Sequence, residues 1–134
     1  MLMLMVATLL AQEPNCEDPQ YQAEMNHCAV ISFKRADAEL NRIWPQLLAD
    51  AREADADINR EFDDRPTGEQ VLREAQRAWI KFRDQHCAYE GYEARGGSME
   101  TMLYEGCRAE LTRQRVQQLT GRLGLDASPE DPAR

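Results

Sequence analysis

Histidine is scarce in this chain of 134 residues, which contains only His27 and His86. Neither one can be placed in a Ser-His-Asp or Cys-His constellation of the kind that supports nucleophilic catalysis. Acidic residues are abundant, but carboxylate pairs in a helical protein lie mostly on its surface. The sequence therefore predicts a protein that is not an enzyme.

Long apolar runs are also missing. After residue 11, no segment approaches the about 20 apolar residues that a helix needs to cross a bilayer. No alternation of apolar and polar residues is long enough to build a sheet, and there is no internal repeat. Almost every long segment has a helical period instead, which predicts a single all-α domain.

Positive charge is in the minority, and the formal net charge is −8. The phosphates of nucleic acids and of anionic membrane surfaces would repel such a protein. We therefore expect no nucleic-acid partner. The lack of a long apolar run predicts no membrane span in the mature protein. The charge favours solubility and cationic protein partners.

Metal-binding spacings are absent as well. Zinc sites built from four cysteines usually contain close C-x₂₋₄-C pairs, and this chain has none. Asp55, Asp57 and Asn59 imitate the start of a calcium loop, but Arg60 and Pro66 occupy the positions that require glycine and a bidentate glutamate. We expect neither a metal nor a cofactor.

The first eleven residues, Met1 to Ala11, form an uncharged apolar run. Its length suits the apolar region of a secretory signal, with a small residue before the polar segment that follows. The usual basic region is missing, which is compatible with a truncated leader. The alternative is a buried N-terminus of a cytosolic protein, but the run has no polar face. We expect a periplasmic or secreted protein whose mature chain starts near Gln12.

Three helices are expected. In the first, apolar residues from Ala29 to Leu47 recur at alternating spacings of four and three, and Pro45 predicts a kink or a break. The polar stretch 50–68 separates it from a second helix over about 69–92, which Thr67 and Gln70 can begin with a capping box. After the turn at Gly96 and Gly97, a third helix runs over about 99–123. The predicted domain is 12–123, followed by a frayed tail, 124–134.

The second and third helices are expected to form an antiparallel hairpin that turns at Gly97. Large apolar residues on the predicted stripes should anchor the core, and Arg83 and Asp84 should pair with third-helix residues such as Arg115. The expected core anchors are Phe33, Leu40, Trp79, Phe82, Leu111 and Leu119.

Four cysteines in an oxidising compartment should form two disulfides. The sequence alone allows three pairings. Cys87 and Cys107 each lie ten residues from Gly97, so the hairpin places them opposite each other. This geometry selects Cys87–Cys107 and leaves Cys16–Cys28 to attach the N-terminal segment to the first helix.

Acidic residues cluster between positions 50 and 64. The cluster is interpreted either as a solvated connection or as a docking surface for a basic protein. The candidate partner-binding residues are Asp50, Glu53, Asp55, Asp57, Glu61, Asp63 and Asp64.

An ordered series of short blocks resembles the lysozyme-inhibitor LprI-like family over about residues 16 to 123. The blocks are Met25-Asn26-x-Cys28-Ala29, Ala36-Asp37-x-x-Leu40-Asn41, Gln76-Arg77-Ala78-Trp79-x-x-Phe82-Arg83-Asp84-x-x-Cys87, Gly96-Gly97-Ser98, and Cys107-x-x-x-x-Thr112-x-x-Arg115-x-x-x-Leu119.

This resemblance implies a small helical protein of the cell envelope. The family's namesake is a lipoprotein that inhibits lysozyme, but no lipobox precedes Cys16 here. The expected function is binding of a cationic lysozyme without catalysis. The alternative is an envelope module that binds another periplasmic protein or a wall component and has no effect on lysozyme.

Overall fold

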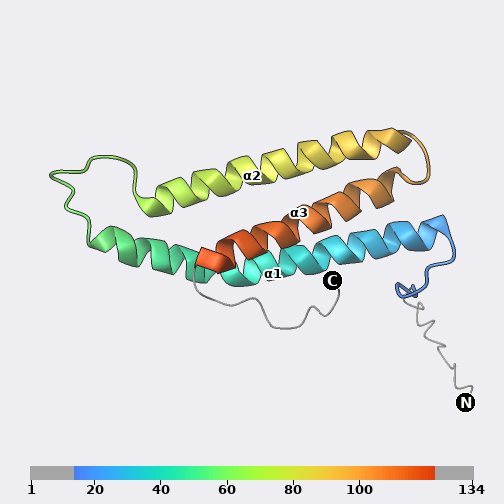
Figure 1. The fold of residues 1–134 in the computed structure, drawn as a ribbon, viewed down its shortest axis with the longest axis horizontal. Helices are drawn as coiled ribbons and strands as arrows, with labels where there is room; N and C mark the ends of the chain where they lie inside the picture. Colours follow the sequence, from blue (N-terminus) through green and yellow to red (C-terminus); the bar gives the residue numbers. More distant parts are fainter. Residues whose placement is uncertain (1–13, 123–134) are drawn as a thin grey trace, which may run out of the picture.

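The computed structural model describes residues 14–122, which form three long helices and a short 3₁₀ helix (Figure 1). Within this range there is no strand, so the all-α prediction is confirmed. The expected leader and C-terminal tail lie outside the described residues. The helices are α1 (Gln22–Ala56), α2 (Gly68–Gly91), η1 (Tyr92–Ala94) and α3 (Glu100–Arg122).

The helices alternate in direction, with α2 antiparallel to both α1 and α3 (Figure 1). The most extensive packing is between α1 and α3. Leu40, Ile43 and Leu47 of α1 are buried against Leu119 of α3. Partly buried side chains from all three helices surround this centre: Trp44, Leu72, Trp79 and Val116.

Helix α1 continues through Pro45 for eleven more residues, so the predicted break is wrong. A proline inside a helix costs about 3 kcal/mol, because it removes a backbone hydrogen bond and crowds the preceding turn. Pro45 itself is exposed, while Ile43, Leu47 and Leu48 are buried on either side of it. Packing of these apolar side chains offsets the local cost and holds the helix together.

Both predicted disulfides are present, and they join Cys16 to Cys28 and Cys87 to Cys107. The second joins α2 to α3 across the hairpin, as the spacing from Gly97 predicts. Gly96 has a φ of 76°, a conformation that glycine adopts without strain. The turn and the disulfide together fix the register of the two helices.

The expected core anchors are buried to different degrees. Leu40 and Leu119 are buried, and Phe33, Trp79 and Leu111 are partly buried.

The assignment of Phe82 to the core is wrong, because 56% of it is exposed. Its ring stacks on that of His86, one turn later in α2, at 5.3 Å between centroids. The buried residues of α2 are Gln76, Arg83, Cys87 and Gly91, so the predicted stripe is only partly correct and Phe82 lies beside the packed face of this helix.

A polar cluster replaces apolar contacts in the middle of the bundle. Arg83 is only 5% exposed, and it donates to Asp84 at 2.9 Å and to Thr112 at 3.3 Å. Asp84 also lies 3.2 Å from Arg108 of α3, whose guanidinium covers the ring of Phe33. Asp84 therefore pairs with Arg108 and not with Arg115, the example expected from the sequence.

Candidate functional site

The excess negative charge of the described residues lies at one end of the molecule. We call residues 50–69 the acidic end; it comprises the last turns of α1, the loop 57–67 and the first turn of α2 (Figure 1). It carries eight acidic residues and three arginines, whereas residues 14–49 and 70–122 together carry twelve of each sign. The charge at this end is therefore not balanced locally.

The predicted polar connection is shorter than the sequence suggests. Asp50, Glu53 and Asp55 lie on α1, which ends at Ala56, and Asp57 is its C-terminal cap. The remaining candidate acids, Glu61, Asp63 and Asp64, lie in the loop. The structure thus brings all seven candidates to one end of the molecule, but some of them belong to helix α1 and the others to the loop.

Asp55 has a structural task that its sequence neighbours do not reveal. Its carboxylate accepts hydrogen bonds from the backbone N–H groups of Gly68, at 2.6 Å, and Glu69, at 2.9 Å. These groups belong to the first turn of α2, where unpaired N–H groups and the helix dipole favour a negative charge. The same carboxylate is therefore occupied and is not available as a calcium ligand.

The predicted capping box completes the start of α2. The hydroxyl of Thr67 accepts from the N–H of Gln70 at 3.2 Å, and the Gln70 side chain accepts from the N–H of Thr67 at 2.8 Å. Together with Asp55, these contacts satisfy most of the free N–H groups of the helix. These hydrogen bonds hold the start of α2 in place next to the end of α1, so both ends of the loop are fixed.

Two of the acids in this region are neutralised by arginine. Glu69 accepts from Arg52 at 2.8 Å and from Arg73 at 2.9 Å, and these hydrogen bonds lower the pKa of its carboxyl. Asp63 accepts from the side chain and the backbone of Arg65, which lowers its pKa to about 2.

Four acids remain available to a partner. Within residues 14–122, the exposed side chains of Glu53, Asp57, Glu61 and Asp64 have neither a hydrogen bond nor an ion pair. Beside them, Phe62 is 88% exposed. An exposed aromatic side chain among unpaired charges is typical of protein-binding surfaces, where aromatic residues supply much of the energy. Phe62 is not among the site residues predicted from the sequence, because its position in the loop gives no periodic signal.

A groove opens at the acidic end. It has a volume of about 800 Å³ and lies between the last turns of α1 and α3 and the first turns of α2. Leu47, Leu72, Val71 and Leu119 supply much of its apolar lining, and Asp50 and Asp55 lie along its α1 side. Asp50 accepts a hydrogen bond from Gln46, a neutral partner, at 2.8 Å.

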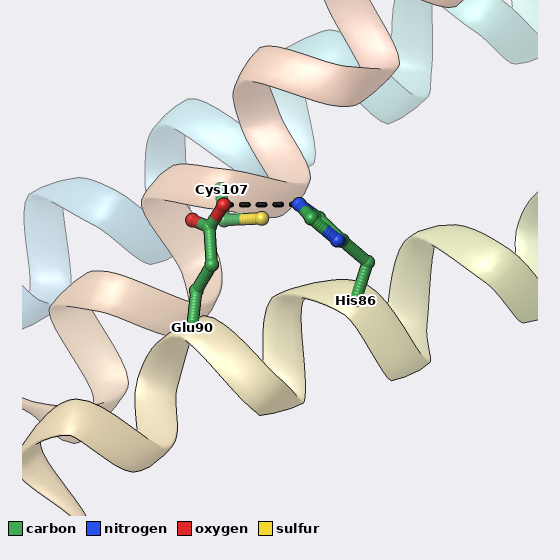
Figure 2. Close-up of side chains that lie close together, drawn as sticks. All are labelled: His86, Glu90 and Cys107. Carbon is green, nitrogen blue, oxygen red and sulfur yellow. Dashed lines mark hydrogen bonds and ion pairs between the residues drawn. The ribbon is translucent and has the colours of Figure 1, made fainter.

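A second cluster lies on the hairpin and has the composition of a metal site. His86 and Glu90 of α2 are 3.0 Å apart and point toward Cys107 of α3 (Figure 2). The sulfur of Cys107 is already bonded to Cys87, however, and a metal would need it as a thiolate. In the oxidised protein this cluster offers only two ligands, the partly buried His86 and the exposed Glu90, so the acidic end is the stronger candidate site.

Comparison with known proteins places this arrangement in a family. The family model described as lysozyme inhibitor LprI matches residues 15–119. An uncharacterized protein of Rhizobium meliloti (strain 1021) is 44% identical over 108 residues, which cover 80% of this chain and 77% of that protein. No solved structure matches the chain.

Proposed function

The chain belongs to the lysozyme inhibitor LprI family, and we propose that it binds a cationic lysozyme through its acidic end and inhibits it without catalysis. The observation that carries the proposal is the concentration of unbalanced negative charge at one exposed end. Opposite charges across an interface steer the encounter of two proteins and raise the association rate. A basic enzyme would meet Glu53, Asp57, Glu61 and Asp64 first, because no arginine neutralises them within the described residues.

We also propose that the protein works outside the cytoplasm, in the periplasm or as a secreted protein. Its two disulfides support this location, because such bonds persist in oxidising compartments. Among the helices of residues 14–122, none is both long and apolar enough to cross a membrane. The proposed leader, residues 1–11, would direct export.

The direct test is the lysis of bacterial cell walls by several purified lysozymes in the presence of this protein. Inhibition should be strongest at low salt and should weaken as the ionic strength rises, because salt screens exposed charges over about 10 Å at 0.1 M. The protein alone should release no muropeptides. Failure to inhibit any of the lysozymes would contradict the proposal and favour the envelope module with another partner.

A further inference from the structure

Within residues 14–122, the third helix extends less far than the first one. Helix α1 has 35 residues and α3 has 23. At 1.5 Å per residue they are about 52 Å and about 35 Å long. Figure 1 shows the last turn of α3 beside α1, well short of the end of α1. The groove at the acidic end thus lies beyond the last described turn of α3.

The lining of this groove combines apolar and charged side chains. Val71 is 55% exposed there, next to Leu47, Leu72 and Leu119. Among the lining residues that fall within 14–122, the one cation is Arg115. It donates to Gln76 at 3.1 Å and to Gln118 at 3.3 Å, and its guanidinium lies 5.7 Å from the centre of the Trp79 ring. All of these contacts are with residues of α2 and α3. Arg115 therefore does not neutralise the acids on the α1 side of the groove.

Charge distinguishes among the molecules that could fill the groove. Residues 123–134 of the same chain carry three acids and one arginine, and a second copy of the protein would bring a formal charge of −8. Asp50 and Asp55, the acids that line the groove within the described residues, repel both. A segment with lysine or arginine next to apolar side chains complements both these acids and the apolar lining.

We infer that the groove is the docking site for a cationic, amphipathic segment of the partner. Its apolar side chains pack between Val71 and Leu119, and its basic side chains meet Asp50 on the α1 side. This inference rests on the proposed function for the identity of the partner as a lysozyme. Beyond that function, it identifies the groove as the binding surface and specifies that the bound segment is cationic and amphipathic.

A matched pair of substitutions tests the inference. Ala75 and Ala78 are both exposed on α2, but only Ala75 lines the groove. Ala75→Lys and Ala78→Lys change the net charge equally, so they have similar effects on long-range attraction. Ala75→Lys should weaken binding of an inhibited lysozyme about tenfold, and Ala78→Lys less than about twofold. Equal effects, or none, would overturn the inference.

A second measurement keeps the test independent of the lysozyme. A synthetic helical peptide of lysine and leucine is titrated into the full chain while the methyl signals of Val71, Leu72 and Leu119 are recorded by NMR. These signals should shift in the parent and stay fixed in Ala75→Lys. If no lysozyme is inhibited but the peptide still shifts them, the proposed function fails and the groove inference stands. If the peptide shifts none of them, the inference fails.

Two further outcomes would assign the groove to another occupant and overturn the inference. If the full-length double variant Leu123→Ser/Leu125→Ser binds the peptide about tenfold more tightly than the parent protein does, the C-terminal segment of the same chain fills the groove. If sedimentation shows a dimer that Ala75→Lys abolishes and Ala78→Lys preserves, a second copy fills it.

Discussion

The carboxylate of Asp55 lies against the backbone of Gly68, with 2.6 Å between Oδ1 and the amide nitrogen. A Cβ atom at position 68 would come within 3.0 Å of the same oxygen. The acid thus joins the end of α1 to the start of α2, thirteen residues later in the chain. Because of this contact, Asp55 does not belong to the group of acids that are free to bind a partner.

We predict that Asp55→Asn destabilises the protein by about 1 kcal/mol, as the loss of a helix N-terminal cap does. The asparagine side chain can accept from only one of the two N–H groups, and it brings no charge to the helix dipole. Urea denaturation measures the change. Asp57→Asn is the control, because Asp57 is exposed and its side chain makes no contact with α2 among the described residues. Equal midpoints for the two variants would show that the Asp55 contact contributes nothing.

The elements that sequence reasoning predicted correctly depend on local patterns. Helical periodicity predicted three helices, the Thr67 capping box predicted the start of α2, and equal distances from Gly97 predicted the Cys87–Cys107 disulfide. Each of these signals can be read within one helix or one hairpin. The fold class therefore followed from the sequence.

The features that could not be predicted from the sequence depend on how the helices pack against one another. Burial on both sides of Pro45 keeps α1 intact, and the position of α1 and α3 leaves Phe82 exposed. The hydrogen bonds of Asp55 join segments that no local motif connects. The groove lies between ends of all three helices, and no pattern within any one helix shows how those ends are placed.

The two aromatic residues of α2 should differ sharply in their contribution to stability. Trp79 packs against the core and carries the guanidinium of Arg83, 5.1 Å from its ring centre, so Trp79→Ala should cost about 3 kcal/mol. Phe82→Ala should cost less than about 1 kcal/mol, because the side chain is mostly exposed. Thermal denaturation of both variants compares them. A larger loss for Phe82→Ala would contradict the exposure of its ring.

The Asp63–Arg65 pair predicts an acid-sensitive contribution to stability. Hydrogen bonds from Arg65 lower the pKa of Asp63 in the folded protein to about 2, below its ordinary value of 3.8. A carboxyl whose pKa is depressed by folding stabilises the protein above its ordinary pKa, and the contribution is lost as the pH falls toward 2.

NMR titration of the Asp63 carboxyl gives the test of this pair. In the parent its midpoint should lie near pH 2, and in Arg65→Gln it should rise toward the ordinary value. Because Asp63 is at the surface, we expect the effect on the unfolding free energy to be small. An unchanged midpoint in Arg65→Gln would show that Arg65 does not hold the carboxylate.

The unpaired acids of the acidic end should control the rate of association with a cationic lysozyme. Glu53→Gln, Glu61→Gln and Asp64→Asn together remove three charges and retain the size of each side chain. Asp55 and Asp63 stay unchanged because their contacts hold the backbone. The association rate should fall, the dissociation rate should change little, and the dependence on salt should flatten.

The matched control is the combination of Glu17→Gln, Glu93→Gln and Asp18→Asn. Like the first variant, it neutralises two glutamates and one aspartate, but at exposed positions outside the acidic end. Both variants have the same net charge, so a contact through overall charge alone would slow association equally in the two. A slower association only in the first variant would place the contact at the acidic end, because local potential, not total charge, steers the encounter. Equal rates in both would mean that the lysozyme approaches another face of the bundle.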